Sequence, residues 1–192
     1  YIFRKSRATS ALFIFLLLMS FQFVGCSSST QLSSTDFDTK TPYQYVTREQ
    51  WGAKEVQPGG KNHSITHVTL HHGGEFFAED KDVLNYLPSF QKWCMQDKHW
   101  IDIPYHFIID AKGIVYEARP IEFAGDTNTS YDPAGHALIC VLGNFEEQPV
   151  NRFQLQSTIV LMANLCNQYG VKTDSIKSHK DYTETLCPGK NL

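Results

Sequence analysis

The sequence predicts one α/β domain of the α+β type, in which helices flank a mixed central β-sheet. Three patterns lead to this prediction. Short segments rich in β-branched and apolar residues are interspersed with longer segments whose apolar residues recur at helical spacing. Two of the short segments, 105–110 and 114–118, are joined by three residues, the length of an antiparallel hairpin connection. A further segment, 137–142, is apolar throughout, which is typical of a strand buried on both faces of a sheet.

The other strand predictions rest on local residue chemistry. Residues 65–72 (ITHVTLHH) alternate, are rich in β-branched residues and end abruptly at Gly73-Gly74. In the hairpin, Gly113 stands where a positive φ is needed. Residues 175–178 are expected to form a short strand that leads to His179. The expected sheet is therefore mixed, with at least one hairpin.

Two segments are expected to be helices. Residues 90–97 have apolar residues at helical spacing, and Pro88 is expected in the first turn, where proline is tolerated. A longer helix is expected between Asn151, which can cap its N-terminus, and Gly170, which ends it. The predicted core stripe of this helix consists of Leu155, Ile159, Met162, Cys166 and Tyr169.

The N-terminal segment has the pattern of an export signal. Arg4, Lys5 and Arg7 precede an apolar run, 11–19, and small residues follow near Cys26. The ending Phe-Val-Gly-Cys resembles a bacterial lipoprotein cleavage site, at which the cysteine is acylated. An ordinary secretory signal with a chance cysteine is one alternative. An uncleaved anchor is another, although the run is short for a membrane span.

These features divide the chain into a signal peptide (1–25), a Ser/Thr-rich flexible tether (26–45) and one folded domain (46–192). The chain begins with Tyr1, and we expect its true start to lie upstream. Lipid at Cys26 would anchor the domain to the bacterial cell envelope on the periplasmic side, at the outer membrane in a Gram-negative host. Without the three basic residues of the signal, 14 basic residues face 20 acidic ones, a net charge of −6. This acidic balance argues against a nucleic-acid partner.

The chain contains five cysteines. If Cys26 carries lipid and Cys187 binds a metal, an odd number remains, so they cannot all form disulfides with one another. We expect Cys94, Cys140 and Cys166 to be buried free thiols, because they lie in helix-like or apolar strand segments.

A metal-ligating pattern lies near the C-terminus. His179 and Cys187 are eight positions apart and are joined by a polar loop. Imidazole and thiolate are good zinc donors, and either His71 or His72 offers a third. Strand parity does not choose between these two, because adjacent side chains face opposite ways. Three protein ligands would leave an open position, as in a catalytic zinc site, whereas the alternative is a chance His/Cys pair.

Several segments, in this order, resemble the type 2 N-acetylmuramoyl-L-alanine amidases, and particularly their peptidoglycan recognition protein branch. They include a tryptophan motif, a His-His strand, a W-x-D-I-x-Y-x-F segment and a final H-K-D…T-x-C-P-G stretch. The matching segments are residues 48–53, 69–72, 100–107, 113–119, 142–145 and 179–189. The resemblance covers nearly the whole predicted domain and implies the fold of that family.

The resemblance also implies a set of site residues. By position, His71, His179 and Cys187 match the ligands of one Zn²⁺ ion per chain. Tyr105 falls on the tyrosine that family amidases place beside the metal, and Thr185 falls where they keep a Thr or Lys. Members that bind without cleaving typically lack the metal cysteine, so Cys187 favours catalysis.

The implied reaction is hydrolysis of the amide between N-acetylmuramic acid and L-alanine of the peptidoglycan stem peptide. Tyr105 is expected to donate to the oxyanion, with Thr185 supporting it or the substrate. Asp181 is expected to orient a ligand or to cap the loop. The general base is unassigned; Glu75 is a candidate, and a solvated surface glutamate is the alternative.

The expected partners are peptidoglycan or muropeptides, and we expect a monomer. A non-catalytic peptidoglycan-binding or sensing module on the same fold is the main alternative function. A zinc amidase that acts on another amide, and a lipoprotein with a structural metal, are further alternatives.

Overall fold

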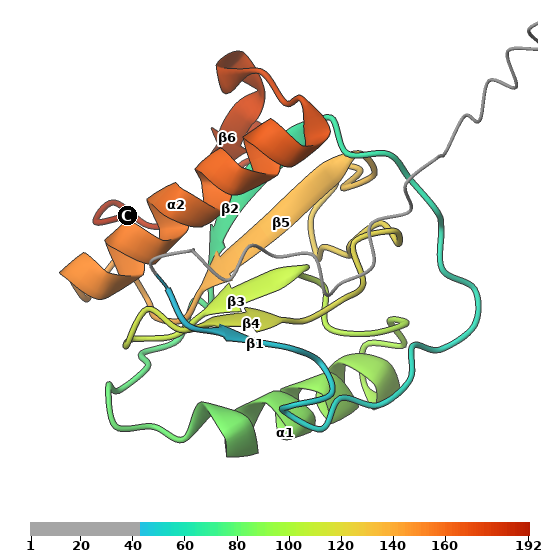
Figure 1. Cartoon of the computed structure of the whole chain (residues 1–192), viewed down its shortest axis with the longest axis horizontal. Coiled ribbons are helices and arrows are strands. Elements are labelled where there is room, and N and C mark those ends of the chain that lie inside the picture. Colours follow the sequence, from blue (N-terminus) through green and yellow to red (C-terminus); the bar gives the residue numbers. More distant parts are fainter. Residues whose placement is uncertain (1–42) are drawn as a thin grey trace, which may run out of the picture. The chain divides into compact units, whose positions relative to one another are not determined.

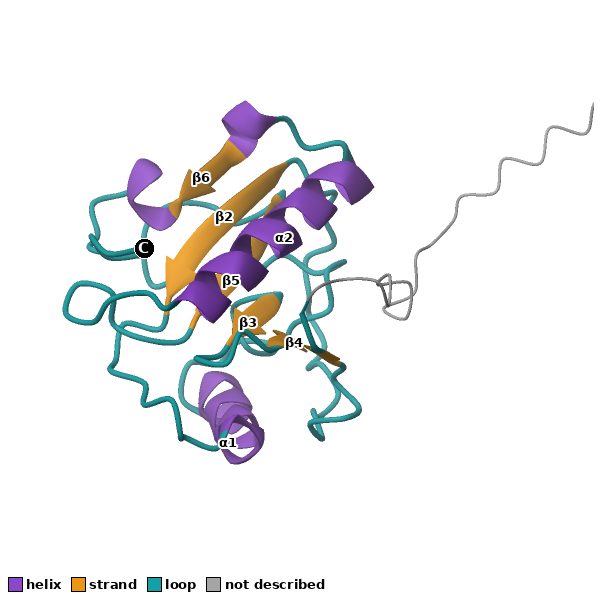
Figure 2. Cartoon of the chain, turned by 60° about the vertical axis from the view of Figure 1, so that its left-hand side comes forward, coloured by secondary structure: helices purple, strands orange, loops and turns teal. Residues whose placement is uncertain are grey.

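The computed structural model describes residues 43–192, so Cys26, the predicted signal and nearly all of the predicted tether lie outside the described residues. A six-stranded mixed sheet lies between two helices, α1 (Val83–Gln96) on one face and α2 (Arg152–Tyr169) on the other (Figures 1 and 2). The predicted fold class, helices flanking a mixed sheet, is therefore confirmed. Within residues 43–192, no helix combines the length and the apolar character that a membrane span needs.

The strand order is β1-β4-β3-β5-β2-β6. Only β3 and β4 pair antiparallel; the other neighbours are parallel. The predicted hairpin and the fully buried central strand β5 are thus confirmed. The strands are β1 (Tyr45–Val46), β2 (His67–His72), β3 (Phe107–Ile109), β4 (Val115–Glu117), β5 (His136–Val141) and β6 (Ile176–Ser178).

The hairpin between β3 and β4 is fixed by one carboxylate and one glycine. Asp110 Oδ1 accepts from the backbone N–H groups of Lys112 and Ile114, at 2.9 Å each. Gly113 has φ +77°, and a Cβ atom there would lie 2.7 Å from the carbonyl oxygen of Phe153 in α2. The hairpin turn therefore needs glycine both for its conformation and for the close approach of α2.

Helix α1 begins earlier than the sequence predicted. Asp82 caps it by accepting from the backbone N–H of Asn85 at 3.2 Å, and Pro88 lies inside the helix. The prediction that Pro88 occupies the first turn was therefore wrong. The helix starts earlier because the Asp82 cap and the burial of Val83 and Leu87 stabilise about a turn and a half of helix before the proline.

The ends of helix α2 agree with the prediction. Asn151 and Gln154 form a reciprocal capping box, and Gly170 ends the helix with φ +65°. The predicted core stripe is wrong at Leu155 and Ile159, which are 44% and 57% exposed. Its other members, Met162, Cys166 and Tyr169, are partly buried and pack against the apolar core on the α2 face of the sheet. The residues of α2 that are buried are Gln154, Ser157, Thr158, Leu161 and Leu165.

The buried polar residues of α2 are tolerated because each has a backbone partner. Gln154 Nε2 donates to the carbonyl of Leu142 at 3.0 Å, and Ser157 Oγ donates to that of Gly113 at 2.6 Å. Hydrogen bonds of this kind offset the cost of burying polar groups. They tie α2 to the loops that follow β5 and β3.

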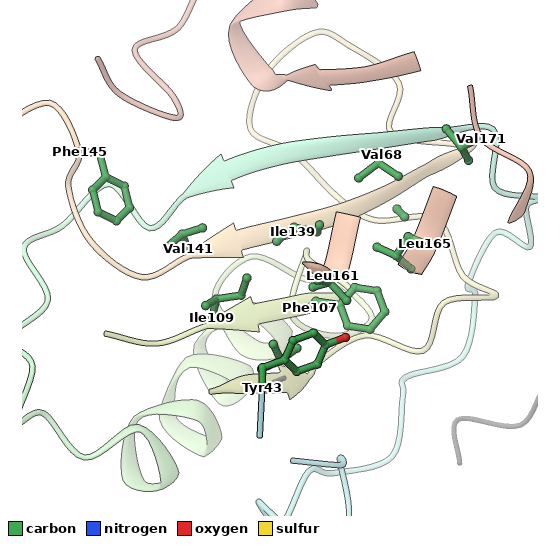
Figure 3. Packing of buried hydrophobic residues seen from close by; sticks show 12 residues of the cluster. Tyr43, Val68, Phe107, Ile109, Ile139, Val141, Phe145, Leu161, Leu165 and Val171 are labelled. Carbon is green, nitrogen blue, oxygen red and sulfur yellow. The ribbon is translucent and has the colours of Figure 1, made fainter. Parts of the chain in front are cut away.

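The sheet separates two apolar cores. Figure 3 shows the first, in which Leu161 and Leu165 of α2 lie over Phe107, Ile139 and other sheet residues. The second lies beneath α1 and includes Leu87 and Cys140. Val68 of β2 belongs to the first core, so its neighbours Thr69 and His67 face the α1 side, as does His71 by strand alternation.

Candidate metal centre

Three predicted ligands converge at one point. The ligand atoms of His71, His179 and Cys187 all lie within 4.8 Å of one another, and all three residues are buried. The Cys187 Sγ lies 3.7 Å from His71 Nδ1, and the ring centroids of the two histidines are 4.6 Å apart. The fold thus brings His71 and Cys187 into contact although they lie far apart in the sequence.

The sheet and a short loop bring these side chains together. His71 is near the end of β2, and β6 pairs with β2 in parallel, with Leu70 opposite Ser178. His179 follows at the start of the 3₁₀ helix η2 (His179–Asp181). The loop then folds back, because the backbone N–H of Lys180 donates to the carbonyl of Cys187 at 3.0 Å.

The structure also shows which of the two adjacent histidines faces the cluster, a choice that strand parity left open: it is His71 and not His72. The Nδ1 of His72 accepts from the backbone N–H of Phe145 at 3.3 Å. Its own backbone N–H donates to Cys187 Sγ at 3.3 Å. The His72 imidazole is therefore engaged elsewhere, and its main chain supports the sulfur.

The donor set fits a zinc ion. Among residues 43–192, the buried Nδ1 of His179 has no hydrogen-bond partner, although burial of an unpaired nitrogen is costly. The Nε2 of His179 lies 2.9 Å from Thr129 Oγ1, and the Nε2 of His71 lies 3.2 Å from the Tyr131 hydroxyl. Both Nδ1 atoms are thus available to a cation beside the Cys187 sulfur, a two-nitrogen, one-sulfur set typical of zinc.

The reasoning from sequence missed Thr129 and Tyr131. They lie in the irregular loop before β5, where no periodicity or spacing marks a side chain that points to a histidine. A partner on the outer nitrogen fixes the tautomer and ring orientation of a ligating histidine. These two residues are therefore positioning residues for any bound ion.

Burial sets the protonation of the cluster. It lowers the pKa of His71 well below its usual value, and the nearby His179 lowers it further. Burial raises the pKa of Cys187 to about 11, against the opposing hydrogen bond from the His72 N–H. The pKa of His179 is lowered by burial as well, so at neutral pH these shifts favour neutral imidazoles and a protonated Cys187 thiol. A bound divalent ion would displace that proton and hold the thiolate.

Tyr105, half-buried, lies beside this cluster. Its ring centroid is 5.2 Å from that of His71. Burial raises its pKa well above 10, with smaller contributions from Cys140 and Cys187. The side chain therefore stays a neutral phenol, able to donate a hydrogen bond to a developing negative charge.

Thr185 and Asp181 shape the ligand loop. Thr185 Oγ1 accepts from the backbone N–H of Cys187 at 3.2 Å. The Asp181 carboxylate accepts from both the backbone N–H and the hydroxyl of Ser178, at 2.7 Å each, which lowers its pKa. Of the two roles expected for Asp181, these contacts describe the loop cap. Glu75 is exposed on the loop after β2, which fits a surface glutamate.

The fold and the site place the chain among α/β domains that carry a buried cluster of three possible metal ligands at a sheet end, with a phenol beside it. The chain belongs to the N-acetylmuramoyl-L-alanine amidase family, whose model matches residues 61–190.

Proteins similar to this chain include peptidoglycan-recognition proteins and an N-acetylmuramoyl-L-alanine amidase. The peptidoglycan-recognition protein SD of Drosophila simulans is 31% identical over 157 residues, covering 77% of this chain and 81% of the relative. The crystal structure of the Drosophila protein SD has a TM-score of 0.69 at 25% identity, covering 78% of this chain and 90% of that one. The N-acetylmuramoyl-L-alanine amidase LysC from Clostridium intestinale URNW has a TM-score of 0.64 at 27% identity, covering 79% and 92%.

Proposed function

We propose that the chain is a zinc-dependent N-acetylmuramoyl-L-alanine amidase. It hydrolyses the amide between N-acetylmuramic acid and L-alanine of the peptidoglycan stem peptide. The observation that carries this proposal is the buried cluster of His71, His179 and Cys187, in which one ring nitrogen among the described residues lacks a partner. Membership in the amidase family and the likeness to LysC support it.

In this proposal, His71 and His179 hold the zinc ion through Nδ1, and Cys187 holds it through Sγ. When bound, zinc supplies a Lewis acid for the scissile carbonyl and lowers the pKa of water toward about 7. The Nε2–H groups of the two histidines then donate to Tyr131 and Thr129, which keeps both rings in place.

Tyr105 acts on the substrate oxygen. As the amide carbon becomes tetrahedral, its oxygen gains negative charge and needs a donor. The phenol of Tyr105 keeps its proton at neutral pH because its pKa is raised by burial. Thr185 orients the main chain at Cys187, since its hydroxyl accepts from that N–H.

A non-catalytic peptidoglycan-binding module is the second candidate. The relatives named as recognition proteins favour it, the 31% identical protein SD among them. The presence of Cys187 in the buried cluster favours the amidase.

The test is digestion of purified sacculi by the region from Ser33 onward, which contains every described helix and strand. The reaction is run with and without a chelator, and its products are identified by mass spectrometry. We expect free stem peptides that begin with L-alanine, and their loss with chelator or with Cys187→Ala. Bound zinc without products from any wall preparation would contradict the amidase and support the binding module.

We also propose that the domain is a monomer held at the periplasmic side of the cell envelope by lipid on Cys26. The basic and apolar N-terminal pattern supports this location. Mass spectrometry of the mature N-terminus from membranes tests it. A diacylated or triacylated Cys26 is expected, and a mature chain that starts elsewhere would contradict the proposal.

A further inference from the structure

The first half of α2 is inverted with respect to an ordinary amphipathic helix. Its buried side carries hydrogen-bonded Gln154 and Ser157, whereas large apolar side chains face solvent. Phe153, Leu155 and Ile159 are 49%, 44% and 57% exposed. Leu155 and Ile159, four positions apart, share one face of the helix with Arg152, and Phe153 lies at the edge of that face, in contact with Arg152. Exposed apolar side chains that share a face mark an interaction surface more often than scattered single residues do. We call Arg152, Phe153, Leu155 and Ile159 the outer face of α2.

Two basic residues, Arg152 and Lys112, lie on and beside this face. Arg152 is the only charged residue among the 18 residues of α2, and its guanidinium lies 4.5 Å from the centroid of the Phe153 ring. Lys112 lies nearby, in the lining of a cavity of about 320 Å³ to which Phe153 also contributes. Apolar side chains flanked by basic ones are typical of helices that lie on a membrane surface. This local pattern stands out in a mature chain whose net charge is negative.

The chain enters the domain beside the same helix. Tyr43 packs against the first core, and its hydroxyl accepts from Asn164 Nδ2 of α2 at 3.3 Å. Tyr43 also lines the cavity shared by Lys112 and Phe153. From Cys26 to Tyr43 is 17 residues, a reach of at most about 60 Å when extended. A membrane attachment upstream therefore connects to the α2 side of the domain.

We propose that the outer face of α2 contacts an anionic lipid surface. The inference rests on the proposed envelope attachment, and it is independent of the amidase chemistry. Because α1 and α2 lie on opposite faces of the sheet, and His71 faces the α1 side, this contact leaves the metal centre open to the cell wall (Figure 1). The outer face thus orients the domain, and lipid at Cys26 retains it.

The test measures sedimentation of the region from Ser33 onward with vesicles of phosphatidylglycerol and phosphatidylethanolamine. This region lacks the proposed anchor, so binding reports the domain itself. We expect vesicle binding, and at least about a tenfold loss of affinity in the Phe153→Ser, Ile159→Ser double variant. The matched control is Leu84→Ser, which alters a side chain that is 50% exposed on α1, and it should bind as the unaltered domain does.

Thermal unfolding and zinc content establish that each variant is folded. No vesicle binding by the unaltered region would overturn the proposal, and so would equal loss in the α1 control. Concentration-dependent self-association that the α2 double variant abolishes, without vesicle binding, would assign the outer face to a second copy instead. Hydrolysis of soluble muropeptides is measured in parallel, so failure of the amidase proposal is seen separately from failure of this one.

Discussion

Two histidine pairs each join a β2 residue to a neighbouring segment: His71 pairs with His179 of η2, and His67 pairs with His136 of β5. The rings of His71 and His179 are 4.6 Å apart, and those of His67 and His136 are 4.7 Å apart. In the second pair, both Nδ1 atoms have hydroxyl partners at 2.8 Å, on Thr66 and Thr69 respectively. In the first pair, His179 Nδ1 lacks a partner within the described part of the chain, and His71 Nδ1 lies beside the Cys187 sulfur.

The two pairs show what distinguishes a candidate ligand from a structural histidine in this fold. Both pairs have close rings, and each has one member on β2, although the His67 and His136 rings are stacked and those of His71 and His179 are tilted by 47°. A buried nitrogen without a partner, next to a thiol, is found in one of them.

The largest effect, on zinc content and amidase activity, is expected from replacing one histidine of the first pair, with a replacement in the second pair as the comparison. His179→Ala removes a ligand, so zinc content and amidase activity should both fall below detection. His67→Ala removes a histidine of the other pair and should keep one zinc ion per chain. Zinc content by elemental analysis and peptide release from sacculi are the measurements. Equal zinc loss in both variants would erase the distinction.

Tyr105→Phe tests the phenol that lies next to the first pair. Because the proposed donor acts on a developing oxyanion, kcat should fall about 100- to 1,000-fold. Zinc content should be unchanged, since the phenol is no ligand in this account. Steady-state rates on a soluble muropeptide measure the effect. A rise in KM with an unaltered kcat would instead make Tyr105 a substrate-binding residue.

Thr129→Val tests the support behind His179 while it preserves the shape of the side chain. Loss of the partner on Nε2 should weaken zinc affinity about 10- to 100-fold. Competition with a chromophoric chelator gives the affinity. Thr127→Val is the control, because Thr127 contacts Thr129 but no ligand. A variant that binds zinc as tightly as the unaltered protein would show that His179 needs no outer partner.

The smallest effect concerns acid stability and His106, which is fully buried. Its Nε2–H donates to the carbonyl of Phe123 and its Nδ1 accepts from the N–H of Leu138, at 2.9 Å each. Burial is the main cause that lowers its pKa from 6.5 to about 3, and the neighbouring charges of His63 and Arg119 lower it further. His106 is therefore neutral in the folded state at any pH well above 3.

Below pH 6.5, His106 becomes protonated in the unfolded chain but stays neutral in the folded chain. The free energy of unfolding thus falls with decreasing pH, by about 1.4 kcal/mol per pH unit for this group. His106→Gln keeps a donor and an acceptor without titrating, so its pH slope should be shallower by that amount. Urea unfolding in chelator at about pH 5 and about pH 7 measures it. Parallel slopes for both proteins would contradict the assignment.

Part of the fold and site was legible in the sequence, for physical reasons. The hairpin at Gly113, the all-apolar β5 and the caps of α2 at Asn151 and Gly170 depend on local residue chemistry, and the structure agrees. The tail spacing of His179 and Cys187 indicated two ligands because a loop needs no register to bring them together.

Other features depend on tertiary contacts that no single-sequence pattern records. The polar side of α2 is buried because loops after β3 and β5 supply carbonyl partners to Ser157 and Gln154. The residue pattern of β2 alone could not distinguish His71 from His72 as a ligand. That distinction depends on the position of Cys187, which is far away in the sequence but lies beside His71 in the fold. Thr129 and Tyr131 reach the histidines from an irregular loop, so they had no signal in the sequence.

Zinc dependence of the amidase is tested by stepwise addition of zinc to the metal-free domain, with release of peptides that begin with L-alanine recorded at each step. Activity should rise linearly and stop rising at one equivalent, and Cys187→Ala should stay inactive throughout. Peptide release by the metal-free protein would contradict a zinc-dependent amidase, and so would one tightly bound equivalent that produces no peptide.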